Sequence, residues 1–319
     1  MIYIILFLFS LLLTYFIKKI AIKKSLVDIP NERSSHTVAT PHGGGLAIAI
    51  TWFIGISYLY YIDDINASFY FSLLAGVIIS IVSYFDDLYE LSAKIRLLTQ
   101  SVVAIIGLYF LGGLEKIDLV VFSIENQYFT NIFAFFMIVW FINLYNFLDG
   151  IDGYAGSEAI FLGFAGFILF SGNHFLVLVA AVAGFLFWNW EKAKIFMGDV
   201  GSTLLGYNIA IFTIYYANAE SSIFVWLILF GVFLFDASIT LYRRFRNGEK
   251  ILQAHKKHAY QRLTQFGWSH SKVVIASIIV NLILLCIVYY ISNIIIAMLI
   301  SIILLYTLLK IIDSKRAFV

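Results

Sequence analysis

Long apolar segments, separated by short polar stretches, run along almost the whole chain. A helix needs about 20 apolar residues to cross a hydrocarbon core about 30 Å thick. Segments of nearly that length can be marked at 2–17, 43–62, 68–85, 97–113, 131–148, 154–171, 174–190, 203–219, 222–241, 272–291 and 294–310. The pattern predicts an all-α polytopic membrane protein with about eleven transmembrane helices.

Composition supports this class. Of the 319 residues, 62% are hydrophobic and only 13% are charged, and the mean hydropathy is +0.93. A soluble domain carries about 25% charged residues. The net charge of +2 gives no reason to expect nucleic-acid binding. The first apolar segment is followed rather than preceded by lysines, which favours a retained span over a cleaved signal peptide.

The basic residues fix the predicted orientation. When successive loops are assigned alternately to two sides, all of the 21 Lys and Arg residues except Lys116 fall on one side. By the positive-inside rule, that side is cytoplasmic, with the N-terminus outside and the C-terminus inside. We therefore expect a single integral membrane domain over 1–319. Its active site would lie in a cytoplasmic-face cleft formed by the loops 18–42, 86–96, 149–153, 191–202 and 242–272.

Acidic residues stand at the ends of apolar segments on that same side. They are Asp86, Asp87, Asp149, Asp152 and Asp199. An ionised carboxylate close to a bilayer is costly unless it faces water, a cation or a metal, so such residues are functional candidates. Mg²⁺ is commonly held by one or two carboxylates together with substrate phosphates and waters. The pattern therefore indicates a site that handles phosphate groups with Mg²⁺.

Two other cytoplasmic loops add candidate anion-binding groups. The first carries Arg33, His36 and a glycine triplet at 43–45, whose backbone N–H groups could approach an anion. The second carries the run His255-Lys-Lys-His258-Ala-Tyr-Gln-Arg262. Simpler interpretations stay open for each piece: close helix packing for the glycines, turns and caps for the acids, and attraction to anionic lipid for the basic loop.

The order of these motifs resembles that of the polyprenyl-phosphate N-acetylhexosamine-1-phosphate transferases, of the glycosyltransferase family 4 type. Five segments carry the resemblance: Asp28–His36 with Gly43-Gly44, Asp86–Leu97, Asn143–Gly153, Phe196–Ser202 and His255–Leu263. They cover the chain from about residue 28 to residue 263.

The resemblance implies a reaction in the bacterial inner (cytoplasmic) membrane. A UDP-activated amino sugar and undecaprenyl phosphate would give undecaprenyl-diphosphate-sugar and UMP, with Mg²⁺ or Mn²⁺ as cofactor. It implies catalytic roles for Asp86, Asp87, His255 and His258, and metal binding by Asp199 and Asp87. The residues that it implies for substrate binding are Asn146, Asp149, Asp152, Lys94, Arg33, Gly43, Gly44 and Arg262. It also suggests a homodimer.

The implied reaction needs little help from a base, because a prenyl phosphate with a second pKa near ~6 is already mostly an oxyanion at neutral pH. Direct attack of that phosphate on the sugar-bearing phosphorus is favoured, and a two-step route through a phospho-aspartate stays open.

The His-rich loop separates subclasses. Enzymes that transfer phospho-MurNAc-pentapeptide for peptidoglycan typically have three consecutive histidines, whereas this chain has His-Lys-Lys-His. The loop looks more like the branch that starts O-antigen (lipopolysaccharide) or related surface polysaccharides, which uses N-acetylhexosamines or their 6-deoxy forms. The peptidoglycan transferase is the alternative within the family. A secondary transporter is the alternative of another class, but it would show internal repeats and charges at the midplane of the membrane, and neither is evident.

Overall fold

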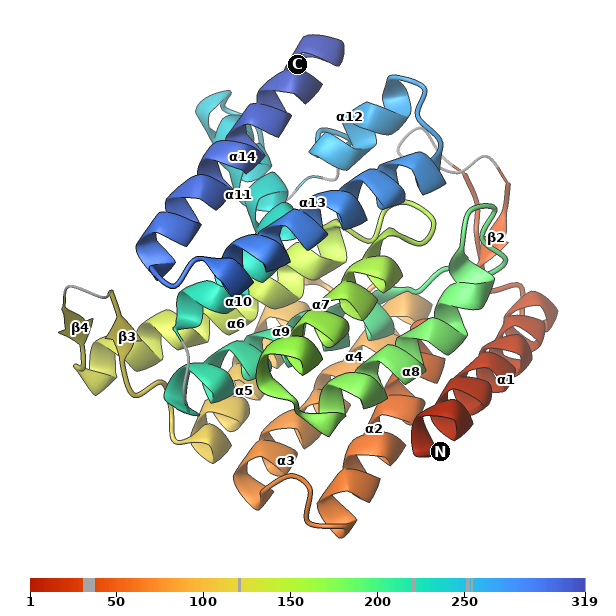
Figure 1. Ribbon diagram of the computed structural model, residues 1–319. Coiled ribbons are helices and arrows are strands. Elements are labelled where there is room, and N and C mark those ends of the chain that lie inside the picture. The colour runs from red at the N-terminus through yellow and green to blue at the C-terminus, as the bar shows by residue number, and fades with distance from the viewer. Residues whose placement is uncertain (31–37, 120–121, 220–221, 251–252, 254, 319) are drawn as a thin grey trace.

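A computed structural model describes residues 1–30, 38–119, 122–219, 222–250, 253 and 255–318. Its helices are α1 (Ile2–Lys23), α2 (Gly45–Tyr61), α3 (Ala67–Leu74), α4 (Gly76–Tyr89), α5 (Ala93–Leu111), α6 (Gln127–Phe147), α7 (Tyr154–Phe170), α8 (Asn173–Asn189), α9 (Asp199–Ala219), α10 (Ile223–Leu229), α11 (Gly231–Arg246), α12 (Ala259–Gln265), α13 (His270–Tyr290) and α14 (Ile294–Lys315). Two short antiparallel hairpins pair β1 (Val27–Asp28) with β2 (Thr40–Pro41), and β3 (Ile117–Asp118) with β4 (Ser123–Ile124). Figure 1 shows the resulting bundle of helices.

Every predicted apolar segment contains a helix, which agrees with the predicted all-α membrane class. Within the described residues, six helices are long and apolar enough to cross a membrane, or up to seven if one bent pair counts as a single span. The helices α2, α7 and α8 are apolar but shorter. The number of eleven spans and the orientation of the termini therefore stay predictions.

Two predicted spans are made of two helices each. α3 and α4 continue one another, because Ala75 between them keeps helical dihedrals (φ −56°, ψ −25°). α10 and α11 instead meet at a bend of 80° around Phe230. The bend redirects α11 toward α12, a short helix that the hydrophobic pattern does not predict because it lies in the polar loop 242–272.

α9 is the central helix of the bundle, and nearly all of its residues are buried. It packs against α2, α4 and α6, as its position in Figure 1 indicates. Small residues allow the close approach. A Cβ at Gly206 would meet the backbone of Phe141, and one at Gly45 would meet the backbone of Gly201. This packing fixes the first residue of α9, Asp199, against the ends of its neighbours.

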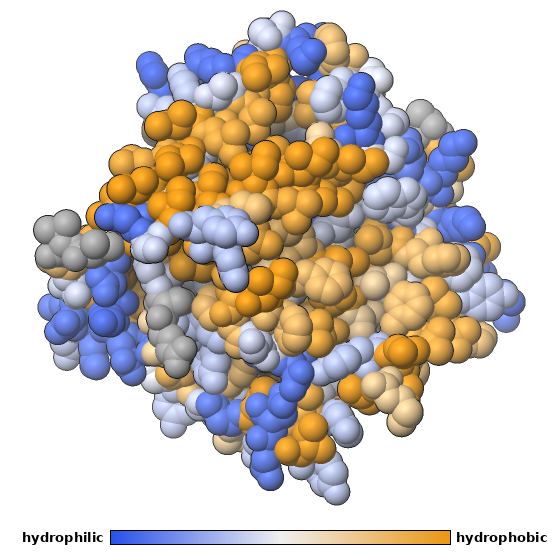
Figure 2. Space-filling model, in the orientation of Figure 1, coloured by the Kyte–Doolittle hydropathy of each residue, from blue (hydrophilic) through white to orange (hydrophobic). Residues whose placement is uncertain are grey.

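The outer helices turn large apolar side chains outward. Figure 2 shows an extended hydrophobic surface on the viewed face, with hydrophilic residues mainly toward its edges. Exposed side chains include Leu12 on α1, Ile279 on α13 and Ile303 on α14, with exposed fractions of 55%, 54% and 64%. Contiguous apolar surface of this kind is rare on soluble proteins and is typical of contact with lipid.

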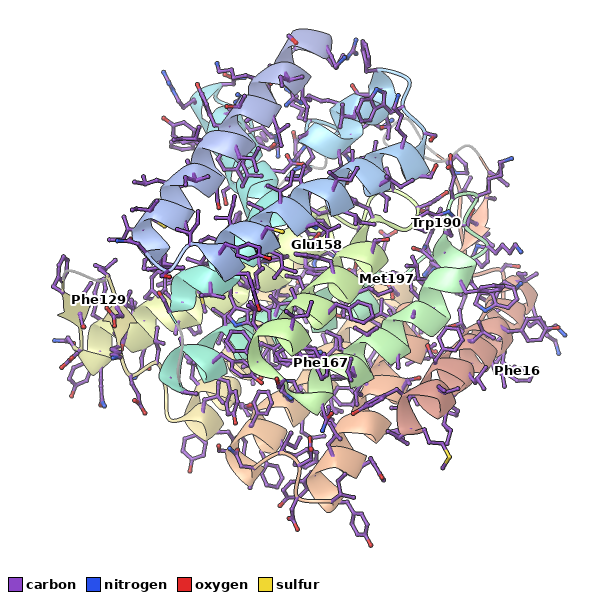
Figure 3. The ribbon with its side chains drawn as sticks, in the orientation of Figure 1. Phe16, Phe129, Glu158, Phe167, Trp190 and Met197 are labelled. Carbon is purple, nitrogen blue, oxygen red and sulfur yellow. The ribbon has the colours of Figure 1, made fainter. Side chains whose placement is uncertain are left out.

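Two acidic residues lie inside apolar helices rather than at their ends, contrary to the expectation from the sequence. Glu158 on α7, labelled in Figure 3, is buried and accepts a hydrogen bond from Asn281 Nδ2 of α13 at 2.5 Å. Asp236 on α11 is also buried. Both have polar partners within the described structure, as buried charges in membrane proteins usually do.

Candidate active site

Asp87 and Asp199 meet where α4 ends and α9 begins. The backbone N–H of Asp199 donates a hydrogen bond to Asp87 Oδ1 at 3.0 Å. Asp87 thus serves α9 as a helix-capping carboxylate would, although it belongs to another helix, and its negative charge lies at the positive end of the helix dipole. The interaction brings two predicted motifs, 112 residues apart, into one site.

Asn146, at the end of α6, completes the junction. Its Nδ2 donates to Asp199 Oδ1 at 2.8 Å and to Ser202 Oγ at 2.9 Å. Because an amide N–H₂ group offers two donors, one side chain holds the carboxylate and the first turn of α9 together. The three helices α4, α6 and α9 therefore all contribute polar side chains to this point.

Gly198 is the glycine of the Met-Gly-Asp motif, and Figure 3 labels its neighbour Met197. It has φ +76°, and a Cβ at this position would lie 2.8 Å from Asp87 Oδ2. Both observations require glycine here. The motif is thus explained by the approach of Asp87 to the start of α9.

The second oxygen of Asp87 is an unusual feature of the junction. Asp87 Oδ2 is buried, and no group of the described residues forms a hydrogen bond with it. A buried carboxylate oxygen without a partner is costly, unless a cation binds there. Carboxylate oxygens are ligands that Mg²⁺ prefers, so Asp87 and Asp199 are the candidate protein ligands.

No group of three or more acidic, His or Cys side chains in the described ranges is arranged to hold a metal by itself. Such a site would need waters and substrate phosphates as further ligands, which is the usual situation for Mg²⁺.

Asp149, in the turn between α6 and α7, experiences the field of this acidic cluster. The pKa of its carboxyl is raised from 3.8 to about 7, mainly by burial and in addition by the negative charges of Asp199, Asp87 and Asp152. Like charges that cannot all be ionised together are typical of sites that bind a cation.

Asp86 has different partners from those of Asp87. Its Oδ1 accepts a hydrogen bond from the backbone N–H of Leu91 at 2.7 Å, and its Oδ2 lies 3.5 Å from Arg96. It also interacts electrostatically with Asp199. Asp86 therefore holds the α4–α5 loop beside the cluster, while Lys94 is exposed on the first turn of α5.

Asp152 binds protein groups on the far side of its turn. Its Oδ2 accepts hydrogen bonds from the backbone N–H groups of Lys192 at 3.0 Å and Ala193 at 3.2 Å, and lies 3.2 Å from His270 Nδ1. These contacts connect the α6–α7 turn to the α8–α9 loop and to α13. The contacts give Asp152 a structural role, and its role in substrate binding stays a prediction.

The glycine triplet does not offer the anion-binding N–H groups that the sequence suggests. Gly44 N–H donates to Phe196 O at 2.9 Å, and Gly45 N–H donates to Met197 O at 2.8 Å. A Cβ at Gly44 would also meet the Phe185 ring. These two amides are used to pack α2 against the α8–α9 loop, so the geometry favours the close-packing alternative. Gly43 has φ +95°, and no heavy atom of the described residues lies within 4 Å of its Cβ position; Arg33 and His36 lie outside the described residues.

The His-rich loop is held by Asp236, which is not among the residues predicted from the sequence. Asp236 Oδ1 accepts a hydrogen bond from Ala259 N–H at 2.8 Å and lies 3.5 Å from Nδ1 of the buried His258. Thr240 Oγ1 donates to the same oxygen at 3.1 Å. The available signal was an aspartate inside a predicted membrane span, which is itself a mark of function.

His255 packs against His258, with 4.8 Å between the ring centroids. The pKa of His255 is lowered from 6.5 to about 4, mainly by burial and in addition by the neighbouring His258 and Arg244. Its Nδ1 accepts a hydrogen bond from Lys257 N–H at 3.2 Å. At neutral pH His255 is thus uncharged with the proton on Nε2, so it can donate a hydrogen bond to an anion but does not bring a positive charge.

Tyr260 links the His-rich loop to the acidic cluster. Its hydroxyl donates to Phe147 O at 3.2 Å, and Gly150, next to Asp149, has no room for a Cβ because of the same hydroxyl. Arg262, two residues later on α12, points elsewhere: its Nη1 donates to Asp313 Oδ1 at 2.6 Å and to Arg316 O at 2.9 Å. A cavity of about 190 Å³ between α11, α12, α13 and α14 lies behind Tyr260, and it is separate from the acidic junction. The predicted cleft therefore stays a prediction.

Comparisons with known proteins point to the same chemistry. The family model for glycosyl transferase family 4 matches residues 69–217, a range that includes Asp87, Asn146 and Asp199. The chain is 34% identical over 289 residues to a probable undecaprenyl-phosphate N-acetylglucosaminyl 1-phosphate transferase of Bacillus subtilis, covering 86% of this chain and 79% of that protein. It is 30% identical over 290 residues to the undecaprenyl-phosphate alpha-N-acetylglucosaminyl 1-phosphate transferase of Escherichia coli K12, covering 82% of this chain and 76% of that protein. The corresponding transferase of Salmonella typhi is 29% identical over 291 residues.

Proposed function

Because the chain belongs to the polyprenyl-phosphate N-acetylhexosamine-1-phosphate transferases of glycosyl transferase family 4, we propose that it transfers a sugar-1-phosphate from a UDP-sugar to undecaprenyl phosphate. The products are undecaprenyl-diphosphate-sugar and UMP. The observation that supports this best is the junction of Asp87, Asn146 and Asp199, where a buried oxygen of Asp87 has no hydrogen-bond partner among the residues that the structure describes.

The protein residues act mainly by positioning. A phosphate oxygen of the lipid attacks the sugar-bearing phosphorus, and the bond from that phosphorus to the UMP oxygen breaks. Asp87 and Asp199 together would hold Mg²⁺, which would neutralise charge on the diphosphate. Asn146 fixes the orientation of the Asp199 carboxylate through the 2.8 Å hydrogen bond. Asp86 keeps the α4–α5 loop in place through its hydrogen bond with Leu91 N–H, and Lys94, at the start of α5, would contact the diphosphate.

The His-rich loop would also contact the phosphate groups. His255 donates a hydrogen bond from Nε2 to a phosphate oxygen, since its Nδ1 is already bonded to Lys257 N–H. His258 is oriented by Asp236 and supplies the second imidazole. Hydrogen-bond donors fixed before the reaction stabilise charge that develops on phosphate oxygens.

The cellular role follows from the membrane class and the loop motif. The enzyme would act at the cytoplasmic face of a bacterial inner membrane, with the N-terminus outside and the C-terminus inside. The departure from three consecutive histidines favours initiation of O-antigen or a related surface polysaccharide over the transfer of phospho-MurNAc-pentapeptide. The donor is an N-acetylhexosamine or its 6-deoxy form, and the names of the relatives make UDP-N-acetylglucosamine the first to test.

The test is transfer of radiolabelled sugar phosphate to undecaprenyl phosphate by the purified protein with Mg²⁺. UDP-GlcNAc, UDP-GalNAc, a UDP-6-deoxy-N-acetylhexosamine and UDP-MurNAc-pentapeptide are offered separately, and Asp199→Asn serves as the inactive control. A labelled lipid with one of the amino-sugar donors supports the proposal and identifies the sugar. Product with only the pentapeptide donor would move the enzyme to the peptidoglycan branch. Folded protein that gives no labelled lipid with any donor would overturn the proposal.

A further inference from the structure

A single carboxylate in the last turn of α14 binds side chains of two neighbouring helices. Asp313 binds Arg243 of α11 in a two-point contact, with distances of 2.9 Å from Nη1 to Oδ1 and 2.8 Å from Nη2 to Oδ2. The same carboxylate accepts a hydrogen bond from Arg262 Nη1 of α12 at 2.6 Å. Charge-assisted bonds of this geometry are stronger than neutral ones and also fix direction.

The residues after α14 add further contacts to the same basic groups. Arg262 Nη1 donates to the backbone carbonyl of Arg316 at 2.9 Å. The ring of Phe318 lies under three cations, with distances from its centroid of 5.2 Å to Arg243, 5.6 Å to Lys257 and 5.6 Å to Arg262. Cation–π contacts at this range are favourable. We call Asp313, Arg316 and Phe318 the C-terminal clamp.

The clamp holds one end of α12, and Asp236 holds the other. α12 has only 7 residues, and a helix that short is not stable without tertiary contacts. Its N-terminal end follows His258 and is bound by Asp236. Its C-terminal half is fixed through Arg262, whose side chain is only 3% exposed and thus deeply buried against the clamp.

We propose that Asp313 is a positioning residue for the transferase reaction: through Arg262 it sets the place of α12, and with it the place of His255 and His258 at the active site. The inference rests on the proposed function only in assigning these histidines to the reaction. Asp313 itself acts through Arg262 and Arg243 and is not expected to touch the substrate. A C-terminal helix is thereby made part of the catalytic unit.

The test compares Asp313→Asn, Asp313→Glu and the control Lys310→Gln in the full-length protein. Lys310 is exposed on the same helix, three residues earlier. Asp313→Asn should lower kcat by about 10- to 100-fold with KM for the UDP-sugar little changed, because loss of placement affects the reaction more than binding. Asp313→Glu should recover much of kcat, and Lys310→Gln should match the unaltered protein. Hydrogen exchange should increase in residues 255–266 for Asp313→Asn, while α6 and α9 stay protected.

Asp313→Asn leaves a buried arginine with a weaker partner and could unfold part of the protein, so Phe318→Ala provides a second test. It removes the ring that three cations share but keeps both ion pairs, and it should give a smaller loss of kcat with the same local increase in exchange. Unchanged kcat in both variants, or a loss that follows the fall in Tm without local exchange in 255–266, would overturn the inference. An unaltered protein that transfers no sugar would instead contradict the proposed function.

Discussion

The carboxylate of Asp87 accepts a hydrogen bond from the backbone N–H of Asp199 at 3.0 Å, across the junction of α4 and α9. One oxygen of Asp87 thus stabilises the start of a central helix, and the other is buried with no hydrogen-bond partner in the described part of the chain. The same residue therefore has a structural contact and an oxygen available for a cation. Mutations of Asp87 and of Asp199 are therefore expected to have different effects.

Replacement of Asp199 by Asn should abolish transfer without unfolding the protein. The amide oxygen can still accept the hydrogen bond from Asn146 Nδ2, so the junction keeps its shape. The negative charge is lost, however, and charge stabilisation by a bound cation is worth several kcal/mol, so the rate should fall by about 100-fold or more. Transfer assays with Mg²⁺, together with a thermal melt, check this. Asp118→Asn, an exposed acid outside the cluster, is the control, and activity of Asp199→Asn near that of the control would remove Asp199 from the metal site.

A single added methyl group at Gly198 should impair the junction. Gly198 has φ +76°, and its Cβ would approach Asp87 Oδ2 to 2.8 Å. Gly198→Ala should therefore displace Asp87 and reduce both activity and Tm. Gly112→Ala is matched to it, because Gly112 has φ +78° but no heavy atom within 4 Å of its Cβ position. The backbone strain costs about 1 kcal/mol in either variant. Equal losses of activity in the two variants would show that strain, and not the contact with Asp87, is responsible.

The acidic part of this site could be predicted from the sequence because membrane proteins rarely place aspartates at helix ends by chance. Asp87, Asp149 and Asp199 come together as expected, and the predicted family is confirmed. The positions of the helices could also be predicted from the sequence, since a helix needs an apolar run of a certain length to cross a bilayer. The bend of 80° between α10 and α11 was not, because the pattern is apolar on both sides of Phe230.

Other roles depend on tertiary contacts that no local pattern reveals. Whether the amides of Gly44 and Gly45 are free for an anion is decided by Phe196 and Met197, some 150 residues away in the chain. Arg262 stands in a motif that suggests substrate binding, yet its partner is Asp313, which is 51 residues further along the chain. Local sequence gives the chemical type of a side chain, and the fold decides what remains available for substrate.

Replacement of Asp236 by Ala should disable the His-rich loop. The carboxylate accepts hydrogen bonds from Ala259 N–H and Thr240 Oγ1 and faces His258 Nδ1, so its removal leaves buried donors without partners. Each buried donor left unpaired costs about 1 to 3 kcal/mol. We expect a lower Tm and a strong fall in kcat. Thr240→Val is the control, because it removes one of these donors but leaves the carboxylate and its contacts with α12. If Asp236→Ala were no worse than Thr240→Val, the loop would not depend on Asp236.

The raised pKa of Asp149 predicts how stability depends on pH in the absence of divalent cations. The folded protein binds the proton of this carboxyl up to about pH 7, whereas the unfolded chain releases it near the ordinary value of 3.8. Between these limits the folded state holds more protons, so its stability should decrease as the pH rises from about 4 to 7. Asp149→Asn carries no such proton and should lose less stability over that range, which melts in EDTA from pH 5 to 8 would measure. Mg²⁺ should stabilise the unaltered protein more at pH 8 than at pH 6, because ionised carboxylates bind the cation better. An identical pH dependence for Asp149→Asn and the unaltered protein would mean that Asp149 is not held protonated by its acidic neighbours.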